Sequence, residues 1–123
     1  MTNKTGKLGE DMASAFLIKK GYAIVERNYH SRWGEIDIIA KQAPYIVFAE
    51  VKTRRKNGMC SPEETVTVAK QQKIIRTALL YVSEHPEYDD FQIRFDVVSL
   101  RTGKNGQVES VDHLSNAFEG ELL

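Results

Sequence analysis

The sequence predicts an α/β domain in which a central mixed β-sheet is flanked by helices. Two stretches carry apolar residues at helical spacing, and five shorter stretches are β-branched or alternate between apolar and polar residues, as strands do. Their order along the chain is helix, three strands, helix, two strands. Because no linker, repeat or low-complexity segment divides the 123 residues, we expect a single domain spanning residues 1–123.

The first half of the chain is expected to form one helix and a meander of three strands. The pattern predicts the helix over residues 7–20, with Gly21 as its terminating residue. The strands are predicted over residues 22–29, 34–41 and 45–52, and the last two are joined by a tight turn at 42–44. The apolar side of the helix is expected to hold Leu8, Met12, Ala15, Phe16 and Lys19.

The second half is expected to contribute a helix and two strands. A helix start is indicated at residues 61–64, although the β-branched residues 65–68 are expected to interrupt it. The strong helical pattern covers residues 69–84, and the strands follow at 92–100 and 107–114. The tail after residue 114 is expected to hold no more than a helical turn. The apolar side of this helix is predicted to consist of Ile74, Ile75, Ala78, Leu79 and Val82.

Composition excludes several classes of protein. Hydrophobic residues make up 41% and charged residues 28%, which is typical of a folded domain rather than a disordered chain. No apolar run approaches the ~18 residues of a membrane-spanning helix, so no membrane association is expected. Cys60 is the only cysteine, so an intramolecular disulfide is excluded. We therefore expect a cytoplasmic protein.

The net charge of zero hides a strong segregation along the chain. Residues 52–80 carry a net charge of +5, whereas residues 81–123 carry −6 and residues 35–51 carry −2. A uniformly basic coat is excluded, but a local site for a polyanion is not.

Charged residues interrupt the two middle strands where an apolar run would be expected. In the third strand, Glu50 and Lys52 share a face with Ile46 and Phe48. In the second strand, Glu35, Asp37 and Ile39 are expected to share one face. If these two strands pair, Asp37 lies beside Glu50, and one end of the sheet presents two or three carboxylates and a lysine.

This arrangement has a structural and a chemical interpretation. A Glu and a Lys on one strand face are commonly a solvated ion pair. The alternative is phosphodiester hydrolysis, because carboxylates bind Mg²⁺ or Mn²⁺ and a nearby lysine can orient the attacking water. The basic loop that follows at residues 54–56 favours the second interpretation.

The same residues carry a family resemblance. Asp37 and Glu50-Val51-Lys52 resemble the D…E-x-K signature of the PD-(D/E)xK, or restriction-endonuclease-like, superfamily. More narrowly, several segments resemble the YraN family (uncharacterised protein family 0102), which is similar to archaeal Holliday-junction resolvases. These segments are Gly9-Glu10, Asn28-Tyr29, Gly34-Glu35-Ile36-Asp37, Phe48 to Arg54 and Arg94-Phe95-Asp96.

The resemblance implies a three-layer fold of core order α-β-β-β-α-β with a divalent-metal site at one end of the sheet. It implies that Asp37 and Glu50 are metal ligands and that Lys52 is the catalytic lysine. Glu10 matches an additional acidic position of resolvase-like proteins, as a ligand and catalytic residue. A surface acid near a helix start is the alternative for Glu10. The resemblance also allows a homodimer, whose interface no motif identifies.

Several basic residues are candidate contacts to nucleic acid. They lie in the loop after the third strand, on the second helix and before the second strand. For the residues of the loop, a solvated loop is the alternative interpretation. The candidates are Arg32, Arg54, Arg55, Lys56, Lys70 and Lys73. Trp33 can stack on nucleic acid or pack internally, and Asp96 is expected to form a structural ion pair.

Two function classes follow from these observations. The first is a Mg²⁺- or Mn²⁺-dependent endonuclease that cuts DNA, including branched or recombining DNA. The second is a non-catalytic nucleic-acid-binding or scaffold protein that retains a nuclease fold. Retention of Asp37, Glu50 and Lys52 favours the first.

Overall fold

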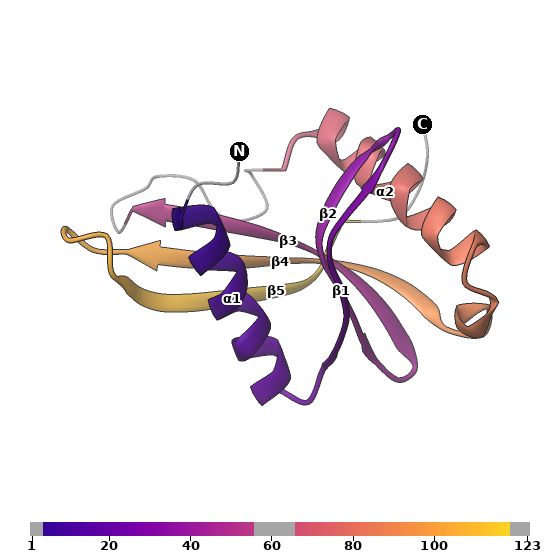
Figure 1. Cartoon of the computed structure of the whole chain (residues 1–123), viewed down its shortest axis with the longest axis horizontal. Coiled ribbons are helices and arrows are strands. Elements are labelled where there is room, and N and C mark those ends of the chain that lie inside the picture. Colours follow the sequence, from indigo (N-terminus) through magenta and orange to yellow (C-terminus); the bar gives the residue numbers. More distant parts are fainter. Residues whose placement is uncertain (1–3, 56–65, 119–123) are drawn as a thin grey trace.

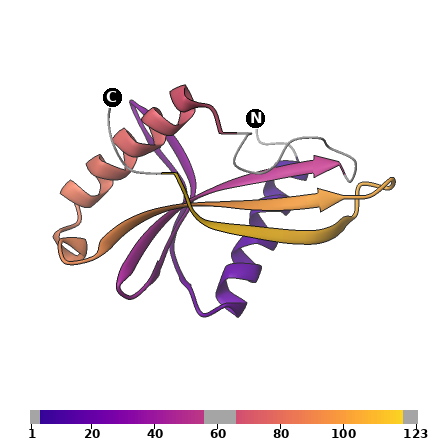
Figure 2. The same ribbon diagram turned by 180° about the vertical axis from the view of Figure 1, so that it is seen from behind.

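The computed structural model describes residues 4–55 and 66–118 and has a five-stranded sheet with one helix on each face (Figures 1 and 2). The strands are ordered β1-β2-β3-β4-β5, and only β3 and β4 pair in parallel. The predicted α/β fold class and its core order are confirmed. The elements are α1 (Lys4–Lys19), β1 (Ala23–Ser31), β2 (Gly34–Gln42), β3 (Tyr45–Arg55), α2 (Val68–Ser83), the 3₁₀ turn η2 (Pro86–Tyr88), β4 (Gln92–Thr102) and β5 (Val108–Phe118).

The last strand extends beyond its predicted end. Strand β5 continues to Phe118, which pairs with Phe95 of β4, and the two rings stack with centroids 5.1 Å apart. The predicted end of this strand at residue 114 is therefore wrong, because the described part of the tail continues the strand. Asn116 has φ 54°, which absorbs a register shift and lets the strand resume its pairing.

Helix α2 begins where its β-branched residues were expected to interrupt it. Thr67 is the N-cap, and its side chain accepts a hydrogen bond from the backbone N–H of Lys70 at 3.2 Å. The helix start indicated at residues 61–64 lies outside the described residues. No helix in residues 4–55 and 66–118 has the length and apolar character needed to cross a membrane.

The face of α2 against the sheet builds the larger core cluster, which we call the α2 cluster. Tyr81 is its central aromatic residue, with its ring 5.0 Å from Tyr29 and 6.0 Å from Phe48. The prediction is wrong for Leu79, which is 43% exposed, because Tyr81 rather than Leu79 points at the sheet. The buried helix residues are Ile74, Ile75, Thr77, Ala78 and Tyr81.

Helix α1 covers the opposite face through small residues, in a second core cluster that we call the α1 cluster. Ala13 and Leu17 are fully buried in it, whereas Leu8 is 55% exposed. The predicted apolar side is therefore wrong for Leu8 and also for Ala15, which is exposed. The helix approaches the sheet so closely that a Cβ on Gly9 would lie 3.1 Å from Thr53 Oγ1. Small residues, which hydrophobic periodicity underweights, make this contact.

The side-chain alternation of β2 breaks at Asp37. Ile36 and Ile39 both belong to the α2 cluster, whereas Ile38 belongs to the α1 cluster, so Glu35, Asp37 and Ile39 do not share a face as expected. Asn28, on the neighbouring strand, has φ 54°. The register pairs β2 with β3 only from Ile38 to Gln42. Beyond that the two strands part, and we call this point the β2–β3 fork.

Candidate active site at the β2–β3 fork

Asp37 and Glu50 lie at the β2–β3 fork, one on each strand. The last paired residues are Ile38 and Ala49, so Asp37 and Glu50 are the next positions on either side. The Asp37 carboxylate continues the contact between the strands, because Oδ2 accepts a hydrogen bond from the backbone N–H of Val51 at 2.8 Å. The expectation that these two acids are neighbours is confirmed, while their roles stay predictions. We call them the acid pair.

The acid pair is electrostatically strained. Burial raises the pKa of Asp37 to about 7, and the charges of Glu50 and, more weakly, Glu10 act in the same direction. The hydrogen bond from Val51 opposes the shift but does not cancel it. Positive charge placed beside Asp37 would therefore favour its ionised form near neutral pH.

Two lysines balance the negative charge of Glu50, a residue that is only 6% exposed. Lys70, in the first turn of α2, lies with Nζ 2.8 Å from Glu50 Oε1, and Lys52 Nζ lies 3.6 Å from the same oxygen. Burial, together with the neighbouring Lys70, lowers the pKa of Lys52 although Glu50 opposes this. Burial also disfavours the charge of Lys70, but the hydrogen bond to Glu50 and the charge of Glu50, with smaller contributions from Lys52 and Asp37, together outweigh burial and raise the pKa of Lys70. The pKa values of the two lysines are therefore shifted in opposite directions.

The structure places Lys70 on Glu50, while its expected contact with phosphates stays a prediction. The first turn of a helix favours acidic residues, because the helix dipole leaves partial positive charge there. A lysine at that position is therefore a signal for a nearby acidic partner. Sequence reasoning missed this signal because the partner lies 20 residues away, on a strand.

Glu10 lies on α1, beside the acid pair rather than within it. Its Oε1 is 3.7 Å from a guanidinium nitrogen of Arg27, and it lines a hollow with Lys7, Arg27 and Asn28. Among the described residues no three His, Cys, Asp or Glu side chains converge in a geometry that could hold a metal ion. Glu10 influences Asp37 through its charge, and its role as a ligand stays a prediction.

The chemistry of the acid pair fits a hard divalent cation. Two adjacent carboxylates repel one another, and a cation between them would relieve the repulsion that raises the pKa of Asp37. Mg²⁺ and Mn²⁺ prefer oxygen donors, and Mg²⁺ is commonly held by one or two carboxylates while it retains several waters. Asp37 and Glu50 are the residues that would hold it.

The other acidic candidates lie away from the fork. The Oε2 of Glu35 is 3.3 Å from His30 Nδ1, near the tip of the β1–β2 hairpin and on the exposed surface. Asp96 is buried on the α1 side. Its carboxylate accepts hydrogen bonds from Nε and from a terminal nitrogen of Arg94, at 2.9 and 2.7 Å. His113 Nε2 and the backbone N–H of Asn116 complete its shell. The expected structural ion pair of Asp96 is confirmed.

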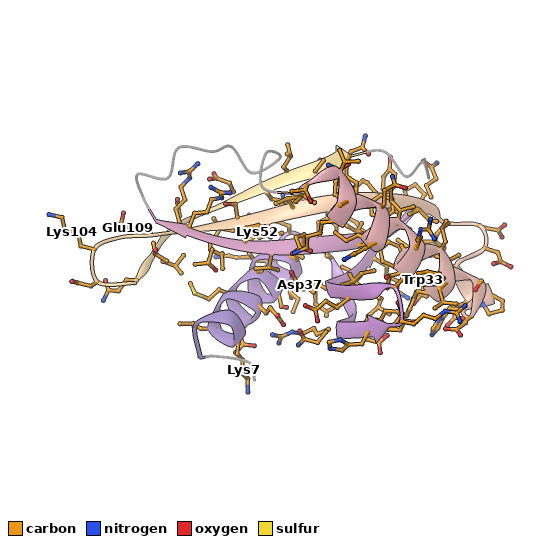
Figure 3. The ribbon with its side chains drawn as sticks, turned by 90° about the horizontal axis from the view of Figure 1, so that it is seen from above. Lys7, Trp33, Asp37, Lys52, Lys104 and Glu109 are labelled. Atoms are coloured by element: carbon orange, nitrogen blue, oxygen red, sulfur yellow. The ribbon has the colours of Figure 1, made fainter. Side chains whose placement is uncertain are left out.

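Part of the predicted basic surface lies along α2 and the β1–β2 hairpin. Lys70 and Lys73 line a hollow with Gly34 and Glu35 of β2. Figure 3 shows Asp37 near the middle of the molecule, with Trp33 farther along beside α2 and Lys52 on β3. Arg54 is half-buried at the end of β3, while the side chain of Arg55 and all of Lys56 lie outside the described residues.

The fold and the fork define a class of protein: an α/β domain whose acid pair, backed by two lysines, lies where two neighbouring strands separate. The sequence model of uncharacterised protein family UPF0102 matches residues 9–100, and the chain belongs to this family. That match spans Glu10, Asp37, Glu50, Lys52 and Lys70.

Relatives extend the likeness over nearly the whole chain. The UPF0102 protein of Syntrophomonas wolfei is 42% identical over 120 residues, which cover 96% of this chain and 100% of the relative. That of Dictyoglomus thermophilum is 44% identical over the same length and coverage. The UPF0102 protein of Clostridium botulinum strain Loch Maree is 42% identical over 114 residues, which cover 93% of each chain.

Solved structures also align with the chain. One of them is SfsA of Pyrococcus furiosus in complex with Ca²⁺, with a TM-score of 0.44 and 13% sequence identity. The alignment covers 89% of this chain and 62% of SfsA. At this level of likeness no property is transferred from SfsA to this chain.

Proposed function

We propose that the protein is a divalent-metal-dependent endonuclease that hydrolyses phosphodiester bonds of DNA, with branched or recombining DNA as its substrate. The observation that supports this most is the acid pair at the β2–β3 fork, with two differentiated lysines on Glu50. The two carboxylates could hold a cation, and the two amines could hydrogen-bond to water and to phosphate.

Each residue has a task in this proposal. Asp37 and Glu50 hold the cation, which supplies charge neutralisation at the scissile phosphate. Lys52, whose pKa is lowered by burial, hydrogen-bonds to the attacking water and holds it in line with the phosphorus, and the proton that this water loses passes to solvent. Lys70 keeps its proton and donates to a non-bridging phosphate oxygen. As the new P–O bond forms, the bond to the leaving sugar oxygen breaks, and that oxygen takes up a proton from solvent.

A homodimer belongs to the same proposal. A four-way junction is approximately two-fold symmetric, and symmetric cutting needs one acid pair on each side. Sedimentation equilibrium with and without junction DNA measures this directly, and two protein chains per junction is the expected result.

A second candidate function has an observation in its favour. Lys70 and Lys52 both form ion pairs with Glu50, as they would in a non-catalytic DNA-binding protein that retains the fold. Such a protein would bind DNA with a steep salt dependence and cut none of it.

The test is a cleavage assay on supercoiled, linear and four-way-junction DNA, with Mg²⁺ or Mn²⁺ and with chelator. We expect metal-dependent cutting that falls by at least about 100-fold in Glu50→Gln and Lys52→Met, because each removes a group needed in the transition state. Lys104→Met and Glu87→Gln, which alter exposed residues outside the fork, should cut like the wild type. Binding without cleavage of any substrate would favour the non-catalytic protein.

A further inference from the structure

Trp33 is an exposed aromatic side chain between two arginines. It lies between β1 and β2, is 39% exposed, and is the only tryptophan in the chain. The guanidinium carbons of Arg32 and Arg76 lie 5.0 and 5.2 Å from the centre of its ring. Among the large apolar side chains exposed in the described part of the chain, it is the one aromatic. Packing therefore leaves this ring partly uncovered.

The hairpin tip that carries Trp33 is fixed to α2. The backbone N–H of Trp33 donates to Ser31 Oγ at 3.0 Å, and Ser31 Oγ is 3.2 Å from Thr77 Oγ1 on the helix. A Cβ on Gly34 would lie 3.5 Å from Lys73 Cβ, so the tip and the helix are in close contact. A ring held in this way loses little conformational entropy when it binds a partner.

A line of positive charge joins this ring to the acid pair. Lys70 contacts Glu50, Lys73 follows one turn later beside Gly34, and Arg76 lies over the indole. Lys70 and Arg76 are six residues apart on α2, which is about 9 Å along a helix axis at ~1.5 Å per residue. That is roughly two to three nucleotides at the ~3.4 Å axial spacing of one DNA strand.

We propose that Trp33, with Arg32 and Arg76, is a stacking platform for an unpaired DNA base two or three nucleotides from the bond held at the acid pair. The inference rests on the proposed function and narrows its substrate to DNA with a single-stranded or splayed segment beside the cleavage point. Within an intact duplex, away from its ends, both faces of every base are covered by stacking, so there only an unstacked base can lie on the indole. Arg32 leaves the ring and pairs with the flanking phosphate, while Arg76 stays over the indole and its charge neutralises a neighbouring phosphate.

The test uses the fluorescence of this single tryptophan. The wild-type protein is titrated with a twelve-nucleotide oligo(dT), a blunt twelve-base-pair duplex, and the same duplex with a three-nucleotide overhang, all in chelator so that nothing is cut. Binding is followed in parallel by the anisotropy of a label on the DNA. We expect the oligo(dT) and the overhang to quench the indole, and the blunt duplex to leave its emission unchanged.

Two variants separate stacking from folding. Trp33→Ala should weaken oligo(dT) binding by about 5- to 150-fold, the range for loss of one base–aromatic stack, and change blunt-duplex binding less than twofold. Trp33→Phe keeps an aromatic ring and should restore most of the affinity, which excludes misfolding as the cause.

Several results would overturn the inference. Oligo(dT) that raises the anisotropy without quenching Trp33 would refute the stacking platform and leave the proposed function standing. Wild-type oligo(dT) affinity in Trp33→Ala would refute it equally. Failure of all three DNAs to bind would refute both proposals.

Discussion

Asp37 is the residue at which burial and charge oppose each other most clearly. Its pKa rises to about 7 because of burial and the charges of Glu50 and Glu10. Since the folded protein prefers the protonated acid, Asp37 contributes stability below its ordinary pKa of 3.8, and this contribution is lost as the pH rises through about 7. The fork therefore gives up stability at neutral pH, which is typical of functional sites.

Replacing Asp37 tests this sign. In chelator, Asp37→Asn should be more stable than the wild type, and its advantage should grow by roughly 2 kcal/mol between pH 5 and pH 8. The asparagine oxygen can still accept the N–H of Val51, so the strand contact is kept. Urea denaturation at both pH values measures the free energies of unfolding, with Asp89→Asn as the exposed control. An advantage that shrinks with pH would contradict the assignment.

At the scale of elements, α1 reaches the sheet through Gly9 and Ala13, and this close approach sets Glu10 beside Asp37. A Cβ on Gly9 would meet Thr53 Oγ1 at 3.1 Å and Leu100 Cδ1 at 3.2 Å. The helix position is thus specified by the absence of a side chain.

Enlarging Gly9 should push the helix away from the sheet. We expect Gly9→Val to lower the free energy of unfolding by about 1–3 kcal/mol, the usual cost of overpacking a tight contact. Ala15→Val, on the exposed side of the same helix, controls for the β-branched side chain and should cost only a few tenths of a kcal/mol. Chemical denaturation measures both variants, and equal free energies of unfolding would show that Gly9 is not a close-contact position.

The elements were predictable where one side-chain pattern decides them. The strands that carry Asp37 and Glu50 are marked by β-branched residues, and their pairing follows from the short turn between them. The break in β2 was not predictable, because it accompanies the left-handed conformation of Asn28 on a different strand. The ion pair of Lys70 was not predictable for a similar reason, since it joins two elements that are adjacent only in the fold.

At the scale of the molecule, the net charge of zero results from a basic region, residues 52–80, and an acidic region, residues 81–123. Within residues 81–123, Asp96 and Asp112 are paired locally with Arg94 and Arg101, so the excess of −6 lies on the remaining charged residues of this segment. Lys70 and Lys73 of α2 instead line a hollow with Gly34 and Glu35, while Arg32 and Arg76 lie over the ring of Trp33. This distribution favours DNA binding without a basic overall composition.

The salt dependence of DNA binding measures this distribution. If Lys70, Lys73, Arg76 and Arg32 each neutralise one phosphate of a single strand, the logarithm of the association constant should fall with the logarithm of salt concentration with a slope of about −3. Lys73→Gln combined with Arg76→Gln should reduce that slope to about half, whereas Lys104→Gln should leave it unchanged. A slope near zero would contradict a phosphate track on this face.

The acid pair as a metal site is the claim on which the proposed chemistry depends, and anomalous scattering from a crystal soaked with Mn²⁺ at pH 8 tests it most directly. We predict one strong peak at about 2.1 Å from a carboxylate oxygen of Asp37 and of Glu50, with Lys70 displaced from Glu50. The peak should vanish in Asp37→Asn. Saturating Mn²⁺ that gives no peak between these two carboxylates, or a peak only elsewhere on the molecule, would contradict a metal-dependent nuclease at this fork.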